Sequence, residues 1–266
     1  SKSKSVKSEA RGVNSRMSKT PPALGKCGAA LLMCVALVSR AMLLGHPATP
    51  VFDETHVGRF LNWYHQRKFF FDVHPPLPKL LMYAVARATG FEGAASCPYE
   101  STRPFAAHCD LAPVRLAPAP AGAALVPLAA ATAERMGLAR HAALLAAWLV
   151  LSDPLFVALS RLHMNDIFLC FFVALTHYAA LGAACTQPDS SVEPMPLAGS
   201  SLRALTATGV ALGCALSCKY GAPLPTLAWL GLQCLHLLAA LAQQGRPVST
   251  VLAAAVARGV LLLGLP

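Results

Sequence analysis

Residues 160–184 read Ser-Arg-Leu-His-Met-Asn-Asp-Ile-Phe-Leu-Cys-Phe-Phe-Val-Ala-Leu-Thr-His-Tyr-Ala-Ala-Leu-Gly-Ala-Ala, and no Asp, Glu, Lys or Arg follows Asp166 in this stretch. An apolar run of about 18 residues or more with few charges is a candidate membrane-spanning helix. Comparable apolar segments lie at 26–45, 113–133, 138–152, 204–218, 222–243 and 249–266. The sequence therefore predicts an all-α integral membrane protein with approximate spans at these seven positions.

The composition also indicates a lipid environment. Of the 266 residues, 55% are hydrophobic and 13% are charged, and the mean hydropathy is +0.52, whereas a soluble domain carries about 25% charged residues. Ala, Gly and Pro are frequent inside the apolar segments, where small residues permit close helix packing and neighbours can satisfy the backbone groups that Pro frees. Because the sequence begins with Ser and ends in the apolar run Val260–Pro266, we expect it to be part of a longer protein.

The net charge of +10 is concentrated at the N-terminus. Seven basic residues and one acid, Glu9, precede the first apolar run; the basic residues are Lys2, Lys4, Lys7, Arg11, Arg16, Lys19 and Lys26. A basic tail beside a span is what the positive-inside rule requires, so we expect residues 1–25 to be a disordered cytosolic tail rather than a nucleic-acid-binding segment. The first apolar run is too long for a signal peptide and contains Arg40, which favours an uncleaved span.

If the spans alternate from a cytosolic tail, the loop 46–112 lies on the opposite side of the membrane. The segment from Phe52 to Tyr64 is predicted to be an amphipathic helix with one face formed by Asp53, Val57, Phe60 and Tyr64. A second amphipathic segment follows Pro75-Pro76 and contains Leu77, Leu80, Leu81, Tyr83, Ala84 and Val85. We expect two short helices on the membrane surface, with carboxylates at the start of the first.

Two cysteines of this loop differ from the others. Cys97 and Cys109 lie in one polar stretch, where an oxidising compartment would allow a disulfide between them. Most of the remaining cysteines lie in or at the edge of apolar runs, where Cys behaves as a small hydrophobic residue.

Asp53 and Glu54 are the strongest candidates for chemistry. At the lipid–water boundary a carboxylate can be partly desolvated, and a neighbouring carboxylate also disfavours its ionisation, so that its pKa rises toward that of a useful base. Inverting glycosyl transfer needs one such base to take the proton of the acceptor hydroxyl. The alternative is a solvated charge pair that stabilises the N-terminus of a helix.

Further ionisable residues are expected on the same side of the membrane as Asp53. They are Arg115, Arg161, His163, Asp166 and Lys219. Ionisable groups at membrane depth are costly and indicate function by default, and the basic ones suit a lipid phosphate, although charges at helix ends can also extend to the interface. Asp153, which precedes Pro154, is expected to be a turn or cap residue.

A metal site is not favoured. Asp53, Glu54, His56, His65, Asp72 and His74 could form a cluster of ligands, but they match neither HExxH nor a standard zinc spacing. His74-Pro75-Pro76 on its own predicts only a turn. We expect neither a metal nor a cofactor.

Several stretches of the sequence, in their order and spacing, resemble the motifs of a known protein family. In the loop they are Val51-Phe-Asp-Glu-Thr-His-Val-Gly-Arg-Phe60, Phe69-Phe-Phe-Asp-Val-His-Pro-Pro-Leu-Pro-Lys-Leu-Leu81 and Gly90-Phe-Glu-Gly93, and downstream Val114-Arg-Leu-Ala-Pro118, Ser160–Phe172 and Gly209–Tyr220. Together they closely resemble the first luminal loop and the later motifs of the protein O-mannosyltransferases, over roughly residues 50–225. Pro78, Met164-Asn165 and Tyr220 depart from the family pattern, in which Gly or Ala, a more apolar pair and Trp are common.

The resemblance implies a GT-C glycosyltransferase fold, of which residues 26–266 would be the N-terminal part. It implies an endoplasmic-reticulum membrane enzyme with a luminal site that transfers mannose, with inversion, from dolichyl-phosphate mannose to Ser or Thr of secretory proteins. A homo- or heterodimer with a related subunit is implied, as is a luminal MIR domain beyond the residues present here.

The same resemblance implies roles for individual residues. Asp53 would be the base and Glu54 its neighbour in the acidic pair. Arg115, Arg161 and Lys219 would make donor-phosphate or structural contacts, and Asp166 and His74 complete the expected substrate-binding set. Another GT-C enzyme that uses a dolichyl-phosphate sugar, or a multispan transporter, is the alternative, and the spacing between Asp53-Glu54 and His74-Pro75-Pro76 favours the O-mannosyltransferase.

Overall fold

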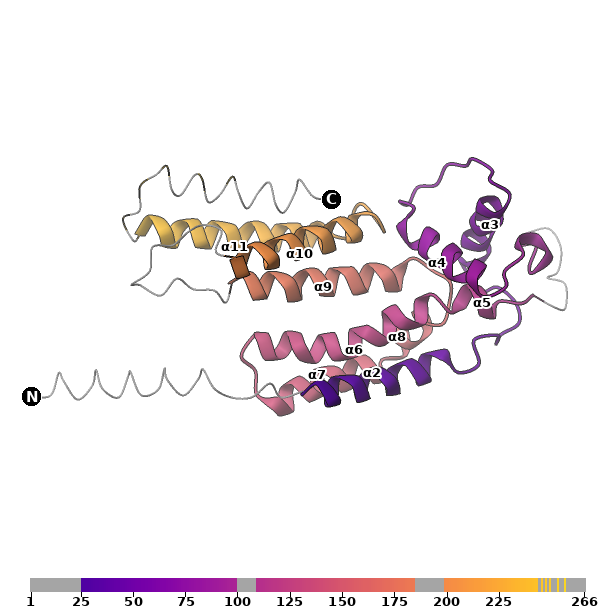
Figure 1. The fold of residues 1–266 in the computed structure, drawn as a ribbon, viewed down its shortest axis with the longest axis horizontal. Helices are drawn as coiled ribbons and strands as arrows, with labels where there is room; N and C mark the ends of the chain where they lie inside the picture. Colours follow the sequence, from indigo (N-terminus) through magenta and orange to yellow (C-terminus); the bar gives the residue numbers. More distant parts are fainter. Residues whose placement is uncertain are drawn as a thin grey trace, which may run out of the picture.

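The computed structural model describes residues 25–99, 109–184 and 199–243, with a few isolated positions beyond 243. The described residues form helices and no strand. The long helices run side by side, and the short helices α3, α4 and α5 gather at one end of them (Figure 1). The long helices are α2 (Lys26–Ala41), α6 (Pro118–Arg135), α7 (Arg140–Ser152), α9 (Asp166–Ala184), α10 (Gly199–Leu216) and α11 (Leu224–Gln243). The short ones are α3 (Glu54–His65), α4 (Leu77–Ala88), the 3-10 turn η1 (Gly93–Ala95), α5 (Ala112–Arg115) and α8 (Pro154–Leu159).

Six of the seven apolar segments predicted from the sequence coincide with these long helices, and the seventh, 249–266, lies largely outside the described residues. The largest difference is in the segment 160–184, because α9 begins only at Asp166. The chain turns before it: Asp153 caps the short helix α8 by accepting a hydrogen bond from the Phe156 amide at 2.9 Å. Arg161 and His163 therefore lie in a connection before the helix and not inside a span.

The helices differ in how well they suit a bilayer. Within the described residues, the helical stretch Ala112–Arg135 is both long and apolar enough to cross a membrane, although half of its most apolar window is buried inside the protein. Arg140–Ser152, Asp166–Gly182 and Leu202–Leu216 are apolar but shorter.

Helix α6 packs against α2, α7 and α9, and small side chains make this possible. Its contacts with α2 and α7 form an Ala-rich cluster of Ala36, Ala123, Val126, Ala130, Ala133, Ala143 and Ala147. Gly122 of α6 lies so close to the α8–α9 connection that an added Cβ would come within 1.8 Å of the Ser160 hydroxyl. Close approach through small residues is the packing mode that helices in lipid favour, and here it fixes α6 against the start of α9.

The loop between α2 and α5 folds into a cap over one end of the bundle. The buried apolar core of this cap includes Val57, Leu61, Met82, Phe91 and Tyr99. A disulfide joins Cys97 to Cys109. The Asn62 side-chain amide donates to the carbonyls of Cys97 and Pro98 at 3.0 and 3.3 Å, so the disulfide-bonded segment is held against α3.

The two amphipathic helices of the loop each bury one face in the protein. Helix α3 buries Glu54, Val57, Gly58, Leu61 and Asn62, and the predicted face of Asp53, Val57, Phe60 and Tyr64 lies beside this buried face and shares Val57 with it. The rings of Phe60 and Tyr64 pack against Phe70 of the following loop, with their centroids 4.9 and 5.0 Å from that of Phe70.

Helix α4 buries Pro78, Lys79, Met82 and Ala86 and leaves Leu80 and Leu81 exposed. Lys79 is the unexpected member of the buried set. Its ammonium lies inside, where its charge and hydrogen bonds are satisfied by Asp72 and by the carbonyls of His74 and Pro75.

Gly58 provides a test of this packing. A Cβ at Gly58 would lie 2.2–2.4 Å from ring atoms of Tyr99, although Gly→Ala inside a helix normally stabilises by about 1 kcal/mol. We expect Gly58→Ala to destabilise the protein by about 1–3 kcal/mol through overpacking. Thermal unfolding in detergent would measure it, with Gly45→Ala as the control, because a Cβ there meets nothing within 4 Å. A stabilised Gly58→Ala protein would contradict the packing.

Candidate functional site

Glu54 and Arg115 form an ion pair that is wholly buried. Glu54 is the first residue of α3, Arg115 is the last residue of α5, and neither side chain is exposed to solvent. Arg115 Nε donates to Glu54 Oε1 at 2.9 Å and Arg115 Nη2 donates to Oε2 at 2.6 Å. Two parallel bonds from a guanidinium to a carboxylate are the strongest and most directional pairing of these groups.

The remaining donors of Arg115 hold the connection between α2 and α3. Its Nη1 atom donates to the carbonyls of Leu44 and Pro47 at 3.0 and 2.7 Å, and Nη2 donates to the carbonyl of Thr49 at 3.2 Å. A guanidinium has five N–H groups, and all of them are used here. The predicted contact of Arg115 with a donor phosphate does not fit this geometry, whereas the structural contact given as its alternative does.

His163 closes the other side of Glu54. Its backbone amide donates to Glu54 Oε1 at 3.0 Å, its Nδ1 atom lies 2.7 Å from the same oxygen, and its Nε2 atom lies 2.9 Å from the Glu54 carbonyl oxygen. The amide of Val51 donates to Glu54 Oε2 at 2.8 Å. This cluster of Glu54, Arg115 and His163, here called the buried charge cluster, joins three segments that are distant in the sequence.

The surroundings of Glu54 decide its protonation. Burial alone would raise the pKa of its carboxyl group, but the hydrogen bonds and charges of Arg115 and His163 outweigh burial and lower the pKa to about 2. The expectation that this pair of acids carries a raised pKa is therefore wrong for Glu54. A carboxylate that is ionised at neutral pH and has both oxygens bonded is suited to holding structure and not to taking up a proton.

Asp53 points elsewhere. It directly precedes α3, yet its carboxylate makes no capping hydrogen bond to the helix, although Asp at this position usually does. Consecutive residues of a helix project about 100° apart, so burying Glu54 turns Asp53 outward. Phe52, just before it, has a φ of 52°, and a left-handed backbone in a non-glycine residue is a form of strain found at functional sites.

Asp53 lines a polar cavity of about 270 Å³ at the end of the bundle. The lining comes from α3 and the residue before it, from the segment before α4, from the start of α9 and the two residues before it, and from the turn after α10. It consists of Asp53, His56, Val57, Phe60, Asp72, Val73, His74, Met164, Asn165, Asp166 and Lys219. The cavity thus brings together motifs that are more than a hundred residues apart in the chain.

Two ion pairs shape the wall of this cavity. Lys219 Nζ donates to Asp166 Oδ1 at 2.6 Å, with both side chains partly exposed, and this pair joins the end of α10 to the start of α9. The pair of Lys79 with Asp72 fixes the segment that carries His74, and the amide of Leu77 donates to the carbonyl of Ser217 at 3.3 Å. These contacts hold the His-Pro-Pro turn against the end of α10.

The structure separates the predicted site residues into groups. Asp53, His74, Asp166 and Lys219 line the cavity, whereas Glu54 and Arg115 lie in the buried charge cluster next to it. Arg161 is in neither group, because its Nη2 atom donates to the carbonyl of Leu43 at 3.2 Å.

The predicted catalytic and substrate-binding set omitted His56, Asp72 and Asn165, which line the cavity, although His56 and Asp72 were considered as metal ligands. His163, expected as an ionisable group on the same side as Asp53, contacts Glu54. His56 and Asp72 lie within the stretches that carried the resemblance, and His56 is three residues after Asp53, which places it close to Asp53 on a helix. No pattern in the sequence indicates that His163 contacts Glu54.

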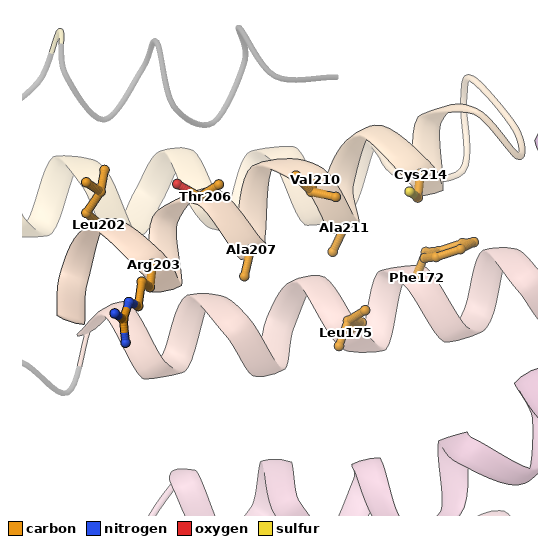
Figure 2. A pocket seen from close by; sticks show the side chains of 9 residues that line it. All are labelled: Phe172, Leu175, Leu202, Arg203, Thr206, Ala207, Val210, Ala211 and Cys214. Carbon is orange, nitrogen blue, oxygen red and sulfur yellow. The ribbon is translucent and has the colours of Figure 1, made fainter. Parts of the chain in front are cut away.

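A second cavity, of about 600 Å³, lies between α9 and α10 (Figure 2). Its lining is apolar except for Thr206 and Arg203, and Arg203 lies near the start of α10, at the end of the cavity away from Phe172 and Cys214. None of the predicted site residues lines it. The smaller cavity, which carries the acid–base groups, is therefore the candidate site.

Comparison with known proteins agrees with this arrangement of motifs. The sequence profile of the family described as dolichyl-phosphate-mannose-protein mannosyltransferase matches residues 30–266. The chain belongs to this family. Dolichyl-phosphate-mannose–protein mannosyltransferase 4 of Candida albicans is 33% identical over 196 residues, and mannosyltransferase 1 of the same organism is 34% identical over 248 residues. The matches cover 71% and 88% of this chain but 24% and 26% of those proteins, so the chain spans about a quarter of the curated relatives it matches.

A solved structure matches the fold. The protein O-mannosyltransferase Pmt1-Pmt2 complex of S. cerevisiae, bound to the sugar donor, contains a chain that superposes with a TM-score of 0.77 at 31% identity. The match covers 90% of this chain and 31% of that chain. The expected all-helical architecture of the family is therefore confirmed for the described residues.

The buried charge cluster generates a stability prediction. Glu54→Gln leaves the Arg115 charge buried without its partner, and breaking a buried pair in this way costs about 3–5 kcal/mol. We expect a clearly lower melting temperature for Glu54→Gln in the full-length protein, whereas Asp53→Asn, the amide substitution at the adjacent exposed carboxylate, should leave it unchanged. Equal melting temperatures for the two variants would contradict the cluster.

The buried charge cluster also predicts how the stability of the protein depends on pH. Folding lowers the pKa of Glu54 from 4.5 to about 2, so the stability contributed by its carboxylate is present above about pH 4.5 and is lost as the pH falls toward 2. The melting temperature of the wild type should therefore decrease more steeply below pH 5 than that of Glu54→Gln.

Proposed function

We propose that the full-length protein transfers mannose from dolichyl-phosphate mannose to Ser or Thr hydroxyls of secretory-pathway proteins, with inversion at the anomeric carbon. The observation that carries the proposal is the position of Asp53. Its carboxylate is not used to cap α3 and lines a polar cavity with Lys219, Asp166 and His74, in a chain that belongs to the dolichyl-phosphate-mannose–protein mannosyltransferases.

The chemistry assigns a role to Asp53. The acceptor hydroxyl oxygen attacks C1 of mannose, the bond between C1 and the phosphate oxygen breaks, and dolichyl phosphate leaves. The Asp53 carboxylate takes the proton of the hydroxyl as the new bond forms, which is general base catalysis. Glu54 contributes indirectly, because its burial turns Asp53 toward the cavity.

Lys219 is the group of the cavity best suited to the donor phosphate. Its ammonium is partly exposed at the cavity wall and is held at 2.6 Å by Asp166. A cation that lies near the phosphate stabilises the negative charge that develops on the leaving group. Asp166 then positions Lys219, and His74, which also lines the cavity, is available as a hydrogen-bonding partner for the substrates.

The membrane setting is part of the proposal. We place the protein in the endoplasmic-reticulum membrane as a multi-pass GT-C glycosyltransferase with the cavity on the luminal side and residues 1–25 in the cytosol. Two features support this orientation: the basic residues precede α2, and the connections of the bundle that carry Asp53, Asp166 and Lys219 meet at the end opposite the start of α2 (Figure 1).

The proposal extends to partners. The solved relative is a complex of two mannosyltransferase subunits with a bound donor. We infer that the full-length protein works as a homo- or heterodimer with a related subunit. Its substrates would be dolichyl-phosphate mannose and acceptor proteins that present Ser or Thr.

Asp53→Asn tests the proposed reaction. Removing a general base costs a factor of about 100 to 10,000, so mannose transfer from dolichyl-phosphate mannose to a Ser/Thr peptide should fall at least about 100-fold, with an unchanged melting temperature. Glu92→Gln, which neutralises an exposed carboxylate of the same loop, is the control and should retain activity. Near-wild-type transfer by Asp53→Asn would remove Asp53 from the role of base.

A further inference from the structure

Asn165 is a residue of the candidate site that the reaction described above does not use. It directly precedes α9, between the buried Met164 and the Asp166 that pairs with Lys219. Its side chain is 6% exposed and forms part of the wall of the cavity that contains Asp53. Within the described part of the chain, its Oδ1 atom accepts no hydrogen bond.

Without a bound partner, the side-chain amide of Asn165 destabilises the folded protein. A buried polar atom without a partner destabilises the folded state, because folding removes the water that satisfied it. The neighbouring side chains of Met164 and Ile167 are apolar and buried, so an apolar residue would fit the packing. The amide therefore indicates a partner that arrives in the cavity.

The chemistry of the cavity limits what this partner can be. The carboxylates of the lining come from Asp53, Asp72 and Asp166, and its cation comes from Lys219. Besides two histidines, the lining contains one uncharged polar side chain, that of Asn165. A carboxamide can donate and accept at the same time, which matches a hydroxyl group, since a hydroxyl also does both. A phosphate only accepts and carries charge, so it is better matched by Lys219 than by Asn165.

We infer that Asn165 hydrogen-bonds one ring hydroxyl of the hexose that the donor delivers, and that it is a specificity-determining residue for that sugar. The inference rests on the proposed function. Asn165 lies next to Asp166, which holds Lys219, so a donor with its phosphate at Lys219 would present its sugar ring beside the Asn165 amide and toward Asp53. This hydrogen bond then distinguishes sugars that carry the hydroxyl from sugars that lack it. It also helps to fix the orientation of C1 toward the acceptor.

The test compares the wild-type full-length enzyme with Asn165→Leu. Transfer is measured with dolichyl-phosphate mannose and with the 2-, 3-, 4- and 6-deoxymannosyl donors, with the donor and the acceptor peptide varied separately. Asn165→Leu should lower kcat/KM for dolichyl-phosphate mannose by about tenfold, as expected for one lost hydrogen bond in a substrate site. The KM for the acceptor peptide should stay the same, and the melting temperature should stay the same or rise.

The decisive outcome is non-additivity. The wild type should lose kcat/KM with each deoxy donor whose missing hydroxyl it binds. At one of the four positions, Asn165→Leu should show no such loss, because the amide that hydrogen-bonds that hydroxyl has been removed. Additive losses at all four positions, or an unchanged kcat/KM for dolichyl-phosphate mannose, would overturn the inference. Leu169→Met, one turn further along α9 and outside the cavity lining, is the control and should match the wild type.

Two further results separate this inference from the proposed function. If the wild type transfers mannose and Asn165→Leu behaves like it with every donor, only the role of Asn165 fails. If the wild type transfers mannose from no donor, the proposed function fails and the inference fails with it. Should Asn165→Leu not fold, Asn165→Ala removes the amide by deleting atoms only and must show the same single non-additive position.

Discussion

Glu54 and Arg115 carry opposite charges into the interior of the protein, where neither side chain meets solvent. Two buried ions are tolerated only when their hydrogen bonds are complete, and here every N–H of Arg115 and both oxygens of Glu54 are bonded. The partners come from the α2–α3 connection, from α3, from α5 and from the α8–α9 connection. The pair is therefore a geometric constraint on the loop, because displacing any one segment would leave a buried charge unsatisfied.

The division of the acidic pair follows from this constraint. With Glu54 fixed inward, the rotation of about 100° per residue at a helix start turns Asp53 into the polar cavity. Two neighbouring carboxylates thus acquire different environments: one is locked in the charged form with its pKa at about 2, and the other faces the space that substrates would occupy. The Lys219–Asp166 pair, which joins the ends of two bundle helices, forms the facing wall.

The apolar segments predicted the positions of the long helices well, because apolar runs, Pro and small residues determine helix formation within the segment that contains them. The predictions that failed depend on which charges pair across the fold. Spacing alone could not show that all donors of Arg115 would be used by Glu54 and three carbonyls, or that Lys79 would point inward. The burial of Glu54 was missed for the same reason, since its partner Arg115 comes from a distant part of the chain. The Cys97–Cys109 disulfide was foreseen only as one possibility, because sequence alone does not give the distance between two thiols.

Carboxyl labelling of the folded, full-length protein tests the central claim most directly. Carbodiimide activation with glycine ethyl ester, followed by mass spectrometry of the peptide that contains both acids, reports the accessibility of Asp53 and Glu54 in one sample. The structure predicts that Asp53 is modified in the folded protein and that Glu54 is modified only after denaturation, because its oxygens are buried and bonded to Arg115, His163 and Val51. Modification of Glu54 at the same rate as Asp53 in the folded protein would contradict the account.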